Sequence, residues 1–363
     1  MIEGLRRAGA DVVECHVPLW TGPEDRVQAA SGGWVNPRFI GRVFKAYLEL
    51  LRRHCSVGDY HIMVVGYPGQ FDVYLARLLT WFRRRPLVWD VFMSIYLIAL
   101  ERGLDKRSAL TVWAIRQIER FACRLPDRLI LDTLEYVEWF RAMHDVKAER
   151  FLLVPTGADD RKYYPVEPKG SEPIFRVVYY GTFILNHGIS YVVEAARLLQ
   201  NEPDIYFEFI GAGPERPRIE ALVRHYGLTN VRFIEWMEST NLCAYLAQAD
   251  VCLGVFGTTE QSLRTVQNKI YEGLAMRKAV ISGDSSAVRR AFTHGQHIYL
   301  CPRGDPVALA DSIRALRRDS DLRARLARQG HARFLEQFSL QANGRLFRDH
   351  LEGVASQHAR IRV

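Results

Sequence analysis

The sequence predicts an α/β fold made of two doubly wound, Rossmann-like domains that face each other across a cleft. Short apolar runs alternate with amphipathic stretches through both halves of the chain, as in parallel sheets covered by helices on both faces. Residues 155–173 are rich in Pro, Asp, Lys and Gly, lack apolar periodicity, and separate the halves as a linker. A length of 363 residues is ample for two domains with their own cores.

The first half shows this alternation from near the N-terminus. Residues 1–10 end as a helix does, with Leu5, two arginines and then Gly9 as a stop. Residues 38–54 carry apolar side chains at helical spacing, whereas residues 128–131 are short and mainly apolar, as buried strands are. The predicted strands are residues 11–15, 61–65, 86–90, 128–131 and 151–154. The predicted helices are residues 38–54, 71–82, 108–125 and 134–143, and residues 20–37 are predicted as a loop.

The second half repeats the pattern more regularly. Strands there end in glycine at Gly181 and Gly211, which permits a tight turn into the following helix. The predicted strands are residues 175–180, 205–210, 231–234, 250–255, 279–281 and 298–300. The predicted helices are residues 189–199, 216–226, 240–248, 268–276 and 305–338, with a final helix over residues 338–351.

The composition excludes several function classes. The net charge of +8 permits anionic ligands without demanding nucleic acid, and neither a zinc-ligand spacing nor a nucleic-acid-binding motif is present. The six cysteines are scattered, which fits free thiols in a reducing compartment better than disulfides. No apolar run is long enough to span a membrane. We therefore expect a cytoplasmic protein, or one held peripherally on the inner face of the membrane.

The stretch from residue 268 to 281 is the basis of the functional prediction. Apolar residues at four-residue spacing mark a helix, and Lys269 and Glu272 share the face beside that stripe. The carboxylate can accept hydrogen bonds from a ribose diol, and the cation can bind phosphate oxygens. The alternative is an ion pair on an ordinary packed helix, and the spacing alone favours that alternative.

The same stretch resembles a known family. Similar chains read Glu-Ala-Met-Ala-x-Gly-x-Pro-Val-Ile where this one reads Glu272-Gly-Leu-Ala-Met-Arg-Lys-Ala-Val-Ile281. It resembles the nucleotide-sugar segment of the family 4 retaining glycosyltransferases (glycosyl transferases group 1) of GT-B architecture. The resemblance implies an acceptor-side domain over residues 1–155, a nucleotide-sugar-binding domain over residues 156–337, and a helix over residues 338–363 that returns to the first domain.

The resemblance also implies a function. It predicts transfer of a hexosyl group from a nucleoside diphosphate sugar to a hydroxyl acceptor with retention of configuration, in the biosynthesis of a glycan or glycolipid. The donor is a substrate, and neither a cofactor nor a metal is expected, because cations and helix N-termini serve the diphosphate in such enzymes. Two alternatives of the same architecture stay open: a non-catalytic nucleotide-sugar-binding protein and a nucleotide-sugar epimerase.

The residues around the donor diphosphate depart from the family pattern. Family members usually carry Arg directly after the first glycine turn and Lys a few residues later. Here the turn reads Gly181-Thr182, and the later place holds His187. We expect Arg264 and Lys269 to replace the missing cations and to stabilise the leaving diphosphate as the glycosidic bond breaks. A solvated, charged loop is the alternative for this segment.

Retaining relatives carry two glutamates separated by seven residues. Glu272 matches the second and is expected to bind the donor ribose. Counting back from it reaches Arg264, whereas counting forward from the strand at residues 250–255 reaches Glu260. Glu260 therefore fills the first place, or the first glutamate is lost.

Four further residues match the family's site by their place in the chain. Gly211 and Gly213 are expected to border the ribose and phosphates, and Trp236 is expected where relatives hold the base. A tight turn and ordinary packing are the alternatives for these three positions. Asp90 ends a strand near the expected acceptor and is a candidate catalytic residue, although a structural polar role explains it equally.

The expected partners are a nucleotide sugar and a saccharide or lipid-linked acceptor, without nucleic acid. Arg116, Arg120 and Arg124 follow helical spacing and make the first half locally basic. A solvated helix face is the favoured interpretation of this row, and a peripheral membrane contact is the alternative.

The resemblance raises one expectation about the start of the chain. Relatives begin with a buried strand and a Gly-rich turn, followed by a helix that ends in a pattern similar to the one at Leu5 to Gly9. We therefore expect the first strand to be missing, with an unfilled place between the strands at residues 11–15 and 61–65. The expectation extends to a poorly folded first domain, or to a functional protein that starts before Met1.

Overall fold

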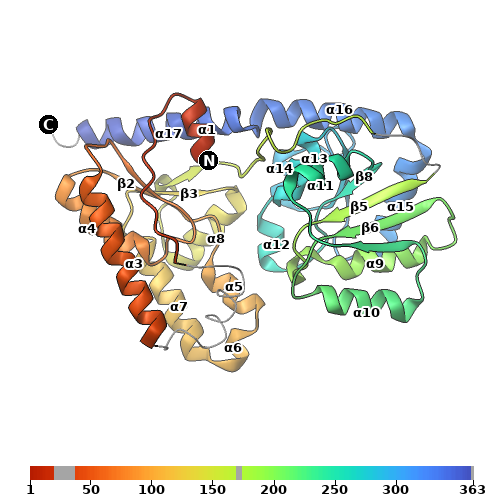
Figure 1. The fold of residues 1–363 in the computed structure, drawn as a ribbon, viewed down its shortest axis with the longest axis horizontal. Helices are drawn as coiled ribbons and strands as arrows, with labels where there is room; N and C mark the ends of the chain where they lie inside the picture. Colours follow the sequence, from red (N-terminus) through yellow and green to blue (C-terminus); the bar gives the residue numbers. More distant parts are fainter. Residues whose placement is uncertain (20–36, 169–173, 361–363) are drawn as a thin grey trace.

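Two parallel sheets organise the protein, one in each half of the chain (Figure 1). The structure is a computed structural model that describes residues 1–19, 37–168 and 174–360. The first sheet has the order β1-β2-β3-β4, with β1 (Met63–Val65), β2 (Leu87–Asp90), β3 (Arg128–Leu131) and β4 (Phe151–Leu153). The second has the order β10-β9-β8-β5-β6-β7, with β5 (Phe175–Tyr180), β6 (Ile205–Ile210), β7 (Val231–Ile234), β8 (Val251–Leu253), β9 (Ala279–Gly283) and β10 (Tyr299–Cys301).

Helices pack against both faces of each sheet. The described helices of the first half are α1 (Ile2–Arg7), α3 (Pro37–Ser56), α4 (Asp72–Arg83), α5 (Ile95–Glu101), α6 (Leu104–Arg107), α7 (Ala109–Ala122) and α8 (Leu134–His144). Those of the second half are α9 (Ile189–Leu198), α10 (Arg216–Tyr226), α11 (Ser239–Leu246), α12 (Glu260–Arg264), α13 (Asn268–Ala275), α14 (Ser286–Ala291), α15 (Pro306–Arg318), α16 (Ser320–Gln337) and α17 (Leu340–Arg360).

The second sheet is buried on both faces, which explains its apolar strands. Along β5, Val177 and Tyr179 belong to the core beneath α9 and α15, whereas Val178 and Tyr180 belong to the core beneath α13 and α16. This alternation follows from the period of two residues in a strand. Both cores use the same strand, so the sheet holds its helices on either side in fixed positions.

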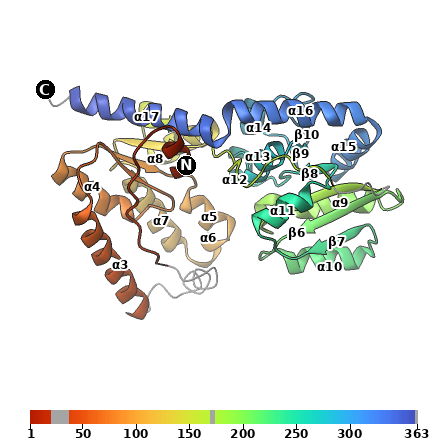
Figure 2. The same cartoon turned by 45° about the horizontal axis from the view of Figure 1, so that its top comes forward.

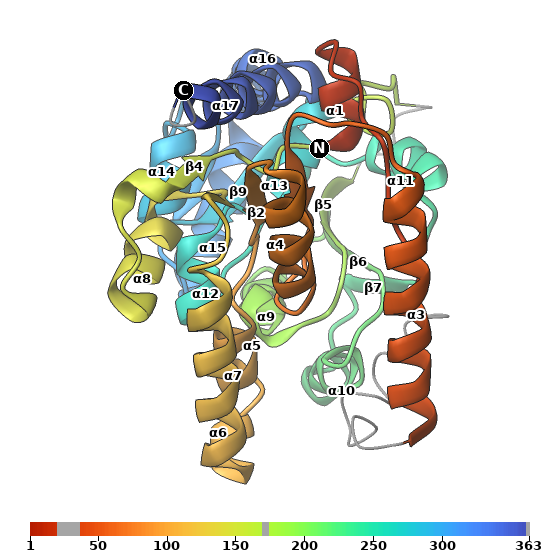
Figure 3. The same cartoon turned by 90° about the vertical axis from the view of Figure 1, so that its left-hand side faces the viewer.

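The first sheet is joined to the end of the chain. Val88 and Ile130 form a core with Leu5 of α1 and with Phe347 and Leu351 of α17. Figures 2 and 3 show α17, in dark blue, lying beside α1 against this part of the molecule, while α16 covers the second half. The final helix therefore packs on the half of the protein that is farthest from it in the sequence.

The strand predicted at residues 11–15 is wrong. These residues belong to no sheet, and Val13 is 65% exposed. Arg6 of α1 holds the segment through a 2.8 Å ion pair with Glu14 and a 3.2 Å hydrogen bond to the carbonyl oxygen of Val12. Among the described residues β1 pairs only with β2. Because residues 11–15 form no strand, the expected unfilled place between them and residues 61–65 does not occur in the sheet.

Four short helices were not predicted: α5, α6, α12 and α14. Three of them begin at a hydroxyl side chain that accepts a backbone N–H, namely Ser94, Thr259 and Ser285, which is a stabilising N-cap. Most of the predicted loop at residues 20–37 lies outside the described residues, and the final helix extends to Arg360. None of the described helices combines the length and the apolar character that crossing a bilayer requires.

Candidate functional site

The candidate site begins where the second sheet changes direction. The chain runs from β5 outward to β6 and β7, then returns to place β8 on the other side of β5. Doubly wound sheets bind ligands outside the carboxyl ends of their strands at such a switch point. The carboxyl end of β5 continues into Gly181 and Thr182, and that of β8 continues into Gly254. The topology thus places the predicted turn at the position where a ligand is expected.

Glycine is required at this switch point because the loops after β5 and β6 approach closely. Gly211 has a φ of +128°, and a Cβ on it would lie 2.2 Å from the carbonyl oxygen of Gly181. Gly213 has a φ of +152°, and a Cβ on it would lie 2.6 Å from the backbone nitrogen of Phe183. Three predicted residues, Gly181, Gly211 and Gly213, are therefore brought together.

We expect Gly211→Ala to lower the free energy of unfolding by at least about 2 kcal/mol, because strained backbone and a backbone clash act together. Gly227→Ala is the matched control: its φ is +61° and no atom would lie within 4 Å of the new Cβ. That control should lose only about 1 kcal/mol. Urea unfolding measures both variants, and equal losses would contradict the close approach.

Lys269 lies beside the turn as a buried cation. The residue is 6% exposed, and its Nζ lies 3.9 Å from the centre of the Tyr179 ring. A Cβ on Gly181 would lie 3.5 Å from Nζ, so the missing side chain leaves the ammonium group facing the turn. No carboxylate of the described residues lies within 4.0 Å of it. Burial lowers the pKa of Lys269 to about 7, although the charge of Glu272 acts in the opposite direction.

Thr182 and His187, which stand in the places of the family's usual cations, contact the same cluster. The Tyr179 hydroxyl lies 3.0 Å from the carbonyl oxygen of Thr182 and 2.8 Å from Nδ1 of His187. The same Nδ1 lies 3.2 Å from Nζ of Lys269. Burial and the charge of Lys269 lower the pKa of His187, so the imidazole is neutral near pH 7. Nδ1 of His187 also lies 2.8 Å from the carbonyl oxygen of Thr182. His187 therefore packs beside Lys269 without adding a second positive charge.

Glu272 lies one turn further along α13 and is half-buried. Burial raises its pKa to about 7, and Tyr163 donates a hydrogen bond to it. A carboxylate can accept several hydrogen bonds, so Glu272 keeps the capacity to bind a diol. Tyr163 comes from the segment that joins the two halves, which brings that segment to the site.

Glu260 and Arg264, the two candidates for the first glutamate place, bind each other. Their side chains form an ion pair along α12, and Arg264 also donates to the backbone carbonyl of Glu260. The charge of Arg264 is therefore neutralised within its own helix, whereas Lys269 lacks such a partner among the described carboxylates. Of the two cations predicted from the sequence to bind phosphate, only Arg264 forms an ion pair within the described protein.

Trp236 and Asp90 lie apart from this cluster. Trp236 follows β7 and is 61% exposed. Asp90 is the last residue of β2 in the first sheet, and burial raises its pKa to about 7. Within the described ranges, no hydrogen bond or ion pair joins either side chain to Lys269. Asp90 lies near Asp132, which follows the neighbouring strand; burial raises the pKa of Asp132 to about 7, and the charge of Asp90 adds to that rise.

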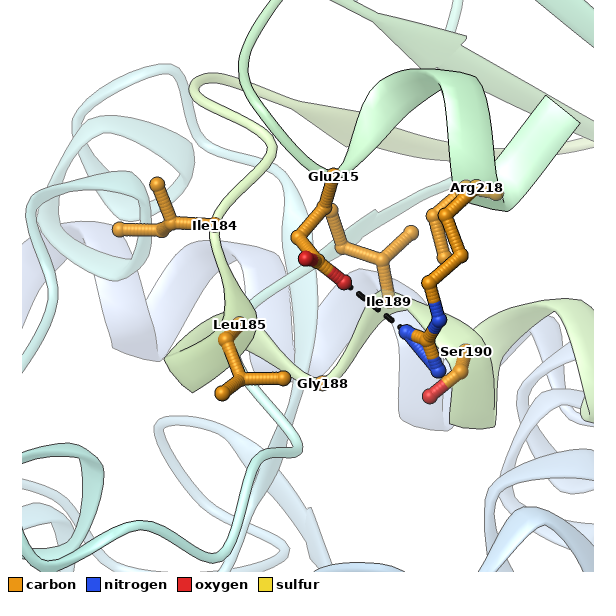
Figure 4. A pocket seen from close by; sticks show the side chains of 8 residues that line it. Ile184, Leu185, Gly188, Ile189, Ser190, Glu215 and Arg218 are labelled. Carbon is orange, nitrogen blue, oxygen red and sulfur yellow. Dashed lines mark hydrogen bonds and ion pairs between the residues drawn. The ribbon is translucent and has the colours of Figure 1, made fainter. Parts of the chain in front are cut away.

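A small hollow behind the same loop is not part of the site. Figure 4 shows Ile184, Leu185 and Ile189 around it, with Glu215 and Arg218 at one side. Glu215 and Arg218 form a 2.9 Å ion pair with each other, so the hollow offers a ligand no unpaired charge. The side of the loop that faces the ammonium group of Lys269 is the better place for an anion.

Sequence reasoning did not single out Tyr179, Tyr163, Asp132 or Thr133. Tyr179 lies inside a predicted strand and Tyr163 inside the predicted linker, so neither carries a local signal. Asp132 and Thr133 directly follow the predicted strand at residues 128–131, and that position at the carboxyl end of a parallel strand was an available signal. Across the described residues, no group of His, Cys, Asp and Glu side chains comes together as a metal site requires.

A family model matches the half of the chain that contains this cluster. The model described as glycosyl transferases group 1 matches residues 174–319, from β5 through α15, and so includes Lys269 and Glu272. The chain contains a glycosyl transferases group 1 domain. The glycosyl transferases group 1 family predicted from the stretch at residues 272–281 is therefore confirmed for this part of the chain.

Curated relatives agree with the group 1 domain. The lipopolysaccharide core biosynthesis glycosyltransferase LpsD of Rhizobium meliloti (strain 1021) is 31% identical over 169 residues, which are 46% of each chain. The alpha-D-kanosaminyltransferase of Streptomyces kanamyceticus is 26% identical over 284 residues, 74% of this chain and 70% of that one. The match to LpsD thus spans about half the length of that relative.

Solved structures extend the likeness to both sheets. Sucrose-phosphate synthase from Thermosynechococcus elongatus superposes with a TM-score of 0.68 at 18% identity, covering 88% of this chain and 79% of that one. Anabaena HepE in complex with UDP-glucose superposes with a TM-score of 0.66 at 14% identity, covering 92% and 90%. With the two Rossmann-like sheets, these likenesses show the GT-B architecture and confirm the predicted fold class.

Proposed function

We propose that this protein is a glycosyltransferase that moves a hexosyl group from a nucleoside diphosphate sugar to a hydroxyl of a saccharide or lipid-linked acceptor. The observation that carries the proposal is the buried Lys269 beside the glycine turn at the β5–β8 switch point, which forms no ion pair with a carboxylate of the described residues. Burying an ammonium group without an ion pair is costly, and a diphosphate at this turn would supply the paired negative charge.

The diphosphate and the ribose diol of the donor would both bind to residues of α13. Lys269 lies in the first turn of α13, where free backbone N–H groups also favour an anion, and Glu272 follows one turn later. Lys269 would bind the phosphate next to the sugar, and Glu272 would accept hydrogen bonds from the ribose. The diphosphate itself is the cation-stabilised leaving group, so no metal or cofactor is invoked. Arg264 would join the phosphates only by leaving Glu260.

The acceptor would enter from the first sheet, where Asp90 is the candidate group for its hydroxyl. Retention of configuration belongs to the same proposal: the leaving diphosphate takes the acceptor proton on the face from which it departs. LpsD is named for lipopolysaccharide core biosynthesis, so a saccharide of a glycolipid is the first acceptor class to test. Location at the inner face of a membrane is part of this proposal only for a lipid-linked acceptor.

The proposal is tested by thermal shift with UDP-, GDP-, ADP- and CDP-sugars, because a ligand that binds only the native state raises its apparent stability. The stabilising donor is then incubated with and without saccharide acceptors while released nucleoside diphosphate is measured, and proton NMR gives the anomeric configuration of the product. Binding without release would favour a non-catalytic binder, and a changed donor sugar without an acceptor would favour an epimerase. Stabilisation by none of the donors would overturn the proposal.

We expect Glu272→Gln to weaken donor binding by about 1.5–3 kcal/mol, because the amide keeps the shape but loses the charged acceptor of the ribose hydrogen bonds. Titration calorimetry with the stabilising donor measures the change. The nucleoside diphosphate alone should lose the same amount, since it carries the same ribose. Unchanged affinity would remove Glu272 from the site.

A further inference from the structure

The junction between α12 and α13 is attached to the first half of the protein. The Thr265 hydroxyl donates a 2.8 Å hydrogen bond to Oδ2 of Asp132, and the Thr133 hydroxyl donates to the carbonyl oxygen of Arg264. Thr133 is also the N-cap of α8, where it accepts from the backbone N–H of Tyr136. The start of α8 and the end of α12 are thus joined by two adjacent hydrogen bonds.

The same junction leads directly to Lys269. Gln267 is the N-cap residue of α13, and its side chain donates a 3.1 Å hydrogen bond back to the carbonyl oxygen of Ser262 in α12. The carbonyl oxygen of Lys269 accepts a 2.7 Å hydrogen bond from the Tyr180 hydroxyl at the end of β5. The position of α13 is therefore set from one side by β5 and from the other by the first half of the protein.

Stability alone does not account for the carboxylate in this contact. Oδ1 of Asp132 is buried and has no hydrogen-bond partner among the described residues, and the other oxygen is held by the neutral Thr265 hydroxyl. No Lys or Arg of the described chain forms an ion pair with Asp132. A buried carboxylate with so few partners costs stability, and an apolar pair of similar size would pack there more favourably. Such a local conflict is expected at functional positions.

We propose that Asp132 and Thr133 are positioning residues that fix the α12–α13 junction, and through it Lys269, relative to the acceptor side of the cleft. The inference rests on the proposed function, which gives Lys269 its role at the donor diphosphate. Reacting groups must be held within a fraction of an ångström for efficient transfer, and Lys269 and Asp90 come from different halves of the protein. The Asp132–Thr265 and Thr133–Arg264 hydrogen bonds fix the chain a few residues before Lys269 relative to the first half of the protein.

The kinetic test is a double-mutant cycle on Asp132→Ala and Thr265→Val. Each single variant should lower kcat about tenfold, the usual effect of losing one buried hydrogen bond. The double variant should be no slower than the slower single, because both changes remove the same contact. Donor affinity should stay within about twofold, since the donor-binding residues Lys269 and Glu272 lie together on α13 in the second half. Additive losses in kcat would overturn the inference.

Conservative variants distinguish a positioning role from a general loss of folding or stability. Asp132→Asn keeps an oxygen for the Thr265 hydroxyl and should keep kcat within about threefold of the wild type. Thr133→Ser should restore the activity that Thr133→Ala loses, because serine keeps the hydroxyl and the helix cap. Thr80→Val is the matched control: Thr80 is fully buried, and among the described residues its hydroxyl bonds only within α4, to the carbonyl oxygen of Arg77 at 3.1 Å. That variant should leave kcat unchanged.

Hydrogen–deuterium exchange of the free protein tests the contact without using activity. Thr265→Val should increase exchange in residues 260–270 severalfold, whereas Thr80→Val should leave that segment unchanged. Unaltered exchange in Thr265→Val would overturn the inference whatever the kinetics show. A wild-type protein that neither binds nor turns over any sugar nucleotide would instead overturn the proposed function. The positioning role in catalysis that is inferred for Asp132 and Thr133 would then fall with it.

Discussion

Lys269→Met is expected to lower kcat by about 100- to 1,000-fold, the loss seen when one preorganised group that stabilises developing charge is removed. The nucleoside diphosphate leaves with negative charge next to the Lys269 ammonium group, and methionine offers no donor there. The same substitution should raise the stability of the free protein, because it removes a buried cation that has no carboxylate partner among the described residues. Activity and stability should therefore change in opposite directions, which an ordinary core residue would not do.

Lys278→Met is the matched control for Lys269→Met. Lys278 is also a partly buried lysine, but its Nζ donates to the backbone carbonyls of Ala247 and Ala249 after α11. Its removal should lower stability, because two carbonyl oxygens lose their donor, and should leave kcat nearly unchanged. Steady-state kinetics and urea unfolding on both variants decide the matter. A Lys269→Met protein with full turnover would exclude Lys269 from the reaction.

The pH dependence of stability gives an independent measure of the same buried charge. The pKa of Lys269 is about 7 in the folded protein and near its ordinary value of 10.5 in the unfolded chain. Between these values the unfolded chain holds a proton that the folded protein has lost, so this group makes stability rise with pH from about 7 to about 10.5. Comparing unfolding curves of the wild type and Lys269→Met over that range isolates the contribution. An identical pH slope in both proteins would contradict a buried Lys269.

Glu119→Ala is expected to cost about 3–5 kcal/mol of unfolding free energy, because it breaks a fully buried polar network. Glu119 and His144 are both 0% exposed, and Nε2 of His144 lies 3.2 Å from a carboxylate oxygen of Glu119. Glu119 also accepts hydrogen bonds from the Ser94 hydroxyl at 2.6 Å and from the backbone N–H of Ile95 at 2.8 Å. One carboxylate thus joins α7 to the start of α5 and the end of α8.

Urea unfolding followed by tryptophan fluorescence measures the effect of Glu119→Ala. The loss should appear in the transition of the first sheet, since the network lies wholly within that half. Glu149→Ala, at an exposed position of the same half, is the control and should change stability by less than about 0.5 kcal/mol. Equal unfolding midpoints in the two variants would show that the network contributes nothing.

Local patterns in the sequence predicted much of the second half correctly. The strand at residues 175–180, the helix over residues 216–226 and the glycine turns at Gly181 and Gly211 were recognisable because apolar periodicity and glycine act over a few neighbouring residues. The strand expected at residues 11–15 failed for the converse reason. A strand forms only where a neighbouring strand pairs with it. Residues 11–15 instead interact with Arg6, which forms an ion pair with Glu14 and a hydrogen bond to the carbonyl oxygen of Val12.

The sequence by itself determined the α/β class, the two parallel sheets and the stretch that carries Lys269 and Glu272, because these depend on local spacing and on a short motif. Only the tertiary structure decided which predicted cation has no ion-pair partner among the described residues. Arg264 finds Glu260 within its own helix, whereas Lys269 is enclosed by Tyr179 and His187, which come from another part of the chain. Burial and charge compensation depend on which residues the fold brings close together. The local sequence does not reveal those distant neighbours.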